Sequence, residues 1–186
     1  FHGEYVRALT LAQSAKATLE ARFSKDFFPG MDDVYDLLAK IHAITNNASE
    51  SVRLLEFAIA SLEKAPRSSP RDIAMLRYDL ATYLSARRRY DESLKQLQLT
   101  KTHFVETTEP NSLQQLFVDV RMMNPLHRLQ RYDEGMALAT TLMPRLRAAL
   151  PPNHQGLIQA LADASALAHD AGEDAVAVSY AREAAE

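Results

Sequence analysis

Two histidines are the first residues of this sequence whose type and spacing could do chemistry. His127 and His169 lie 42 residues apart. In a chain built from repeats of that length, they would occupy equivalent positions on neighbouring helices, roughly 10 Å apart. A metal ion would need closer nitrogen atoms and further ligands. We therefore expect no metal site, and instead two solvated histidines whose charge changes near pH ~6.5.

Other motifs that bind cofactors or catalyse reactions are absent from the sequence. The five glycines, at positions 3, 30, 135, 156 and 172, are scattered, whereas a phosphate-binding loop needs clustered glycines so that backbone N–H groups can approach the anion. No His-Glu-x-x-His or Gly-x-Ser-x-Gly motif occurs. The chain has no cysteine, which removes disulfides, thiolate metal sites and thiol catalysis. We expect neither an enzyme nor a bound cofactor.

The charge balance does not favour a nucleic acid or a membrane as partner. Lys and Arg number 21 against 24 Asp and Glu, which gives a formal net charge of −3. The run Arg87-Arg88-Arg89 is more typical of a helix C-terminus than of a nucleic-acid contact. No apolar run approaches the roughly 18 residues that a membrane-spanning helix needs. We expect a cytoplasmic chain, although a composition without cysteine also fits an extracytoplasmic one.

Internal repetition indicates the elements that must position these side chains. The string Arg-Tyr-Asp-Glu occurs twice, and its tyrosines, Tyr90 and Tyr132, are 42 residues apart. Small residues follow the same period at steps of 43, 42, 42 and 42: Ala8, Ser51, Ser93, Gly135 and Ala177. Prolines precede the helical patterns at steps of 41, 40 and 41: Pro29, Pro70, Pro110 and Pro151. A proline near a helix start costs no hydrogen bond, so two unrelated residue classes report one period.

Apolar residues between these markers recur at helical spacing, as Ile73, Leu76 and Leu80 do. No alternation typical of strands persists. The pattern predicts nine helices, over about 4–25, 31–46, 48–64, 71–87, 90–107, 112–129, 132–149, 154–171 and 173–186. Each helix pair leaves an apolar face that only the next pair can cover. The expected fold is therefore an all-α solenoid of stacked antiparallel helix pairs, with the small residues where two helices approach most closely.

Local signals within these helices add two expectations. Asn111 or Ser112 is a candidate N-cap of one helix, and Asn153 of another. Pro125 and Pro144 fall inside helical patterns, where each removes a backbone hydrogen bond and favours a kink. The kinks are either tolerated irregularities or the cause of a widened pocket.

The repeat resembles the tetratricopeptide repeat (TPR) family, in its 42-residue form like that of kinesin light chains. Residues 3–8 resemble the second-helix opening G-x-Y-x-x-A, and residues 150–155 resemble the connector L-G-P-D-H-P. The resemblance covers the whole chain and implies a right-handed superhelix. It implies one array over 1–186, with a half repeat at 3–28 and full repeats at about 31–65, 71–107, 112–149 and 154–186. HEAT-type helix pairs share the period and are the architectural alternative, although they lack the Tyr-Asp-Glu-small opening.

The sequence departs from the family pattern at several positions. The first-helix position that usually holds a large apolar residue is occupied by Tyr35, Arg77, Asp119 and Leu161. Ala48 and Asp174 replace the usual aromatic residue of the second helix. These departures weaken local packing but not the architecture. The initial half repeat and the final helix would also lack a covering helix. We therefore expect part of a longer protein, or self-association through the uncapped terminal helices.

In the resembled family the first helices line the concave side of the superhelix, which implies a groove for a partner. The helical register assigns these groove residues: Asp36 and Lys40 in the first full pair, Tyr78, Asp79 and Thr82 in the second, Phe117, Arg121, Asn124, His127 and Arg128 in the third, and Asp163 and His169 in the fourth. The same register adds Asp33, Met75, Ser85, Gln159 and Asp170 to this face. Such a mixture of aromatic, amide and charged groups suits recognition of a peptide.

The groove residues also exclude one mode of recognition known in the resembled family. Relatives that clamp a C-terminal carboxylate use Lys, Asn and Arg at set positions. Here Asp36 and Asp79 occupy two of these positions and would repel that ligand.

The resemblance implies a protein-protein interaction scaffold that binds a peptide or partner helix in its concave groove, within a larger regulatory or signalling protein. The alternative is a regulatory domain that senses a small ligand or a signalling peptide, attached to a transcriptional regulator or a kinase.

Overall fold

A computed structural model describes residues 2–66 and 68–186. This part of the chain contains nine helices and no strand, which confirms the predicted all-α fold. The helices are α1 (His2–Arg22), α2 (Met31–Ile44), α3 (Ala48–Lys64), α4 (Pro70–Ala86), α5 (Tyr90–Thr107), α6 (Leu113–Arg128), α7 (Tyr132–Ala149), α8 (Gln155–Asp170) and α9 (Asp174–Ala185). Their bounds agree with the predicted ranges to within a few residues.

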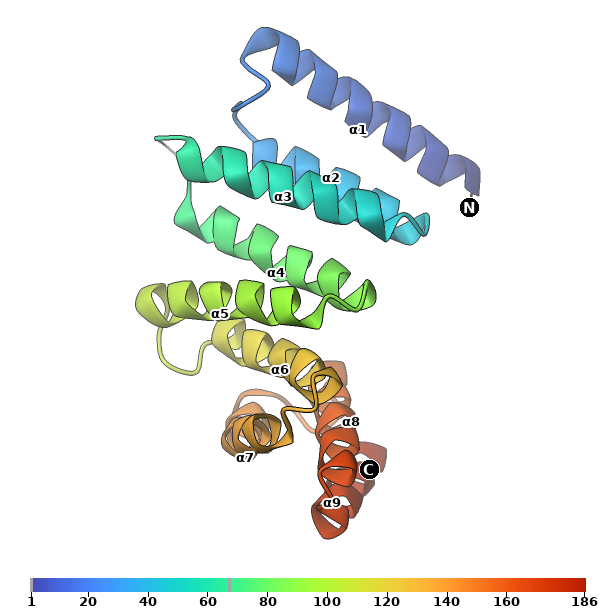
Figure 1. Cartoon of the computed structure of the whole chain (residues 1–186), viewed down its shortest axis with the longest axis vertical. Coiled ribbons are helices and arrows are strands. Elements are labelled where there is room, and N and C mark those ends of the chain that lie inside the picture. Colours follow the sequence, from blue (N-terminus) through green and yellow to red (C-terminus); the bar gives the residue numbers. More distant parts are fainter. Residues whose placement is uncertain (1, 67) are drawn as a thin grey trace. The chain divides into compact units, whose positions relative to one another are not determined.

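The chain forms two compact units, Phe1–His103 and Phe104–Glu186, and each has its own sequence of helix contacts. In the first unit α1 packs on α2, α2 on α3 and α3 on α4, and α2 also contacts α4 directly (Figure 1). In the second unit α6 packs on α7, α7 on α8 and α8 on α9, and α6 also contacts α8. Contact between alternate helices is the arrangement of stacked helix pairs, in which first helices lie beside each other. One continuous array over 1–186 stays a prediction.

Two small residues of the predicted ladder, Ser51 and Ser93, lie where the two helices of a pair cross. In the first unit Ser51 and Ser93 are fully buried. Ser51 Oγ donates to the carbonyl of Ala39 (2.7 Å), and Ser93 Oγ donates to the carbonyl of Ala81 (2.8 Å). Donors and acceptors are each one period apart, so the same crossing contact recurs.

In the second unit the equivalent small residues make other contacts. Ser165 Oγ donates to the carbonyl of Ala177 (2.8 Å), which reverses the direction of the bond. At Gly135 an added Cβ would lie 2.7 Å from Leu167 Cδ2. Here glycine allows the next repeat to approach, because any side chain would have to displace Leu167.

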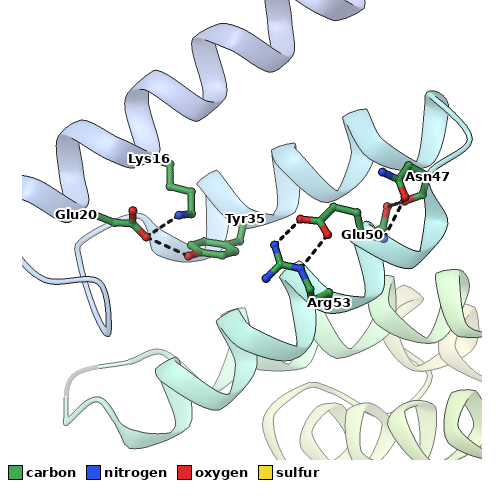
Figure 2. Close-up of polar contacts among 7 residues, drawn as sticks. Lys16, Glu20, Tyr35, Asn47, Glu50 and Arg53 are labelled. Carbon is green, nitrogen blue, oxygen red and sulfur yellow. Dashed lines mark hydrogen bonds and ion pairs between the residues drawn. The ribbon is translucent and has the colours of Figure 1, made fainter.

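The half repeat is attached to the first full pair through polar contacts. Lys16 Nζ on α1 donates to Glu20 Oε1 (2.6 Å), and Tyr35 Oη on α2 donates to the same carboxylate oxygen (3.4 Å; Figure 2). The Tyr35 ring is buried and stacks on Phe57 of α3, with 5.4 Å between ring centroids. Tyr35 therefore joins three successive helices.

The two charged residues that replace apolar ones in the family pattern both have partners on other helices. Arg77 of α4 forms an ion pair with Glu63 of α3 and donates to Gln96 Oε1 of α5 (2.7 Å). Asp119 of α6 is only 2% exposed, and its Oδ2 lies 3.1 Å from Arg145 Nη1 of α7. These pairs compensate the charges within the packed layers.

The N-cap prediction was correct for one helix and wrong for another. The backbone N–H of Gln115 donates to Ser112 Oγ (3.4 Å), as predicted. The cap of α8 is His154, whose Nδ1 accepts from the N–H of Gly156 (3.0 Å). Asn153 lies one residue too early, because the turn after the two prolines ends at His154.

Both internal prolines lie in helices that continue past them. Pro125 is buried within α6, and Pro144 is exposed within α7. An open surface hollow of about 370 Å³ lies beside Pro144, lined also by Asn111, Arg145, Ala148 and Ala149. None of these lining residues belongs to the predicted groove.

Candidate interaction surface

In the first unit, three of the predicted groove residues lie together where α2 meets α4. Lys40 Nζ is 2.5 Å from Asp36 Oδ2 on its own helix. The same ammonium is 3.7 Å from Asp79 Oδ2 on α4. One positive charge thus lies between two carboxyl groups, so the ammonium is engaged within the chain.

The environment of Asp79 disfavours its charged form. Burial raises the pKa of Asp79 to about 6, and the hydrogen bond and negative charge of Asp36 add to this rise, while Lys40 opposes it. The pKa of Tyr83, on the next turn, is raised by burial and by the same two carboxyl groups. This part of the surface is therefore short of positive charge.

The remaining predicted residues of the first unit lie on the same helix as Asp79. Tyr78 and Thr82 are half-buried, and Thr82 Oγ1 donates to the carbonyl of Tyr78 (3.3 Å). Exposed apolar side chains also occur on α2 and α4: Leu37 is 50% exposed and Met75 is 45% exposed. The sequence register predicts Met75 on this face but does not predict Leu37. Leu37 directly follows the predicted groove residue Asp36, and this position is the sequence feature that indicates it.

In the second unit, His127 links the two first helices α6 and α8. Its Nε2 lies 2.6 Å from Asp170 Oδ2 of α8, and its ring centroid is 6.2 Å from that of Tyr132. The side chain is only 16% exposed, so the expectation of a solvated histidine was wrong for His127. The hydrogen bond from His127 lowers the pKa of Asp170.

His169 has a separate environment. It is 73% exposed, and its Nδ1 lies 3.1 Å from Asp174 Oδ1. The two histidines thus contact different carboxylates, although they are one period apart. In the described residues no group of three or more His, Cys, Asp or Glu side chains could hold a metal ion.

Asp163 of α8 lies near the basic residues of α6. Burial raises its pKa, while the hydrogen bond from Gln159 Nε2 (3.0 Å) and the charges of Arg121 and His127 lower it. The structure therefore brings together Arg121, His127 and Asp163, all predicted groove residues.

Three further predicted residues, Phe117, Asn124 and Arg128, also lie on α6. The Phe117 ring is half-buried, with its centroid 6.4 Å from that of His154. A Cβ at Gly156 would lie 3.0 Å from Phe117 Cε1, so glycine allows the ring to lie on the start of α8. Asn124 is half-buried and Arg128 is exposed.

Comparison with known proteins identifies the fold. No family model and no curated protein matches the sequence. Among solved structures, one match is a Podosopora anserina protein assigned as a kinesin light chain, with nearly identical TPR-like repeats. It superposes on this chain with a TM-score of 0.82 at 15% sequence identity. The match covers 99% of this chain and 87% of that one. The chain has the fold of the TPR-like repeat proteins.

A second TPR-like neighbour is more distant. MamA of MSR-1 superposes with a TM-score of 0.62 at 18% identity, covering 96% of this chain and 91% of that one. At these identities the likeness shows the TPR-like fold alone. In the part of the chain that the structure describes, no helix is long and apolar enough to cross a membrane.

Proposed function

We propose that this TPR-like chain is a protein-interaction scaffold that binds a peptide or partner helix on the faces of its first helices, within a larger regulatory or signalling protein. The supporting observation is that the predicted groove residues meet across neighbouring first helices in both units. Lys40 and Asp79 join α2 to α4, and His127 and Asp170 join α6 to α8. Charged, amide and aromatic groups held side by side on packed helices can recognise an extended or helical segment.

The terminal helices offer a second contact surface within the same proposal. Leu11 on α1 is 62% exposed, and Val178 on α9 is also exposed. Apolar side chains on such helices could contact a further helix of the same or another chain. Self-association through α1 and α9 therefore remains part of the proposal.

Selection from a displayed peptide library tests the scaffold role on the second unit. Peptides that bind the chain are measured against a variant carrying Arg121→Ala and Asn124→Ala. We expect the affinity to fall about tenfold or more, because both side chains lie on the proposed face. The matched control is Thr141→Ala, an exposed residue of the second helix α7, which should leave the affinity unchanged.

Two outcomes would argue against this proposal. If the double variant binds the selected peptides as tightly as the unsubstituted chain and has the same melting temperature, the face of α6 is not the binding site. Saturable thermal stabilisation by a small metabolite, without any selected peptide, would favour the ligand-sensing role instead.

A further inference from the structure

Asp36 on α2 has one carboxylate oxygen that is buried. Its Oδ2 accepts from Lys40 Nζ (2.5 Å), but its Oδ1 is buried and finds no hydrogen-bond donor in the described residues. A buried acceptor without a donor is costly, and more so when it carries charge. The site therefore favours any arrangement that supplies a proton to this oxygen.

Asp79 on the neighbouring first helix can supply that proton. The Lys40 ammonium lies 2.5 Å from Asp36 Oδ2 and 3.7 Å from Asp79 Oδ2, so one cation draws the two carboxyl groups together. A hydrogen bond with Asp36 is among the causes that raise the pKa of Asp79. Two adjacent carboxylates repel each other, so a close pair retains one proton more readily than either group alone. We propose that Asp36 and Asp79 share one proton in the folded chain, which makes the contact between α2 and α4 sensitive to pH.

Burial and the neighbouring charges set the range in which this contact changes. Burial and Asp36 raise the pKa of Asp79 to about 6, and Lys40 moderates the rise. Tyr83 also interacts with both carboxyl groups, and it stays neutral near this pH because its ordinary pKa of about 10 is raised further by burial and by the two carboxyl groups.

Some other charged and polar groups on the helices packed against α4 interact with residues outside the pair. Glu63 of α3 and Gln96 of α5 contact Arg77. Asp32 of α2 and Asp72 of α4 repel each other, and the pKa of Asp32 is raised chiefly by its burial. Lys40 is a cation within 4 Å of both carboxyl groups.

The sign of the pH effect follows from the direction of the shift. A carboxyl group whose pKa is raised on folding binds its proton more tightly in the folded chain. Its stabilising contribution is present below the unfolded value of about 4 and is lost as the pH rises through about 6. Above that range the face of α2 and α4 carries one more negative charge and the two carboxylates repel. This inference does not depend on the proposed function.

Carboxyl ¹³C NMR titration of the full chain tests the shared proton. We expect one aspartate signal with a midpoint near pH 6. In Asp36→Asn the midpoint should fall by about one pH unit, because the neighbouring negative charge is removed. Asp33→Asn, an exposed aspartate on the same helix, is the matched control and should leave the midpoint in place.

Thermal unfolding at pH 5 and pH 7 gives an independent measurement. The melting temperature of the unsubstituted chain should fall more from pH 5 to pH 7 than that of Asp79→Asn. Asparagine keeps a hydrogen-bond donor at this position but does not titrate. Titration of both aspartates below pH ~4.5 would overturn the proposal. An equal loss of melting temperature in both proteins would also overturn it.

Discussion

At the scale of single residues, the main feature of this chain is charge placed where an apolar side chain is usual. Asp119 and Arg77 both occupy the large apolar position of the first helix, and each is paired with a residue of an adjacent helix. A buried ion pair contributes little net stability compared with apolar packing, but losing one partner leaves an uncompensated charge. The two members of such a pair therefore differ in what their removal costs.

The pair of Asp119 and Arg145 predicts an unequal response to substitution. Arg145 is 31% exposed and can be hydrated if its partner is removed, whereas Asp119 is 2% exposed and cannot. We expect Arg145→Met to lower the free energy of unfolding by about 2 kcal/mol or more, and Asp119→Leu to change it by less than about 1 kcal/mol. Urea denaturation of each variant measures the difference.

Arg147 provides the control for this prediction on the same helix. It forms a more exposed ion pair with Glu183 at 2.6 Å. Exposed pairs contribute at most about 1 kcal/mol, so Arg147→Met should have a small effect. Equal losses in Arg145→Met and Arg147→Met would show that the burial of Asp119 does not decide the cost.

The sequence showed these charged positions but not their partners. It predicted that Arg77 and Asp119 would weaken local packing, because each replaces an apolar residue of the repeat. The compensating residues, Glu63 and Arg145, lie on other helices. Helical periodicity within one segment does not report which side chain of another segment packs opposite, so such a pair appears only in the folded structure.

At the scale of helices, the two internal prolines show how tertiary packing overrides local preference. Pro125 lies within α6 and Pro144 within α7, and both helices run through them. Each proline leaves one carbonyl of the preceding turn without its usual donor. The environments differ, because Pro125 is buried and Pro144 is exposed.

Replacing the two prolines with alanine should separate these environments. We expect Pro144→Ala to raise the free energy of unfolding by about 1–3 kcal/mol, because a helix interior disfavours proline and little packing is lost. Pro125→Ala should gain less, since removal of a buried ring leaves a cavity. Chemical denaturation gives both values. A larger gain for Pro125→Ala than for Pro144→Ala would contradict this explanation.

Helix positions could be predicted well, because two independent signals, small residues and prolines, mark one period. The start of α8 was less certain. The sequence favoured Asn153 as the cap, since asparagine is a strong capping residue. The structure uses His154 instead, because the backbone of the turn, rather than the preference of the side chain, decides which residue precedes the helix.

At the scale of the whole chain, local contacts explain why the fold was accessible from the sequence. Helices contact neighbours one or two places away, as α2 contacts α3 and α4. An array of this kind needs few long-range pairings, so periodicity determines most of the architecture. The candidate surface was less accessible. The register predicted His127 and Asp163 as groove residues on neighbouring first helices, but it did not indicate that the His127 ring contacts Tyr132, which lies on a different helix.

The same local connectivity predicts how a core defect spreads. Leu161 is fully buried in α8, and Leu38 is buried in α2 of the other unit. We expect Leu161→Ala to cost about 2–5 kcal/mol and to speed amide hydrogen exchange in α7, α8 and α9 far more than in α2, α3 and α4. Leu38→Ala, the matched change, should produce the converse pattern, because each repeat is stabilised mainly by its neighbours. Uniform acceleration across both units in either variant would mean that the chain unfolds as one cooperative block, and nearest-neighbour stacking would then not describe its stability.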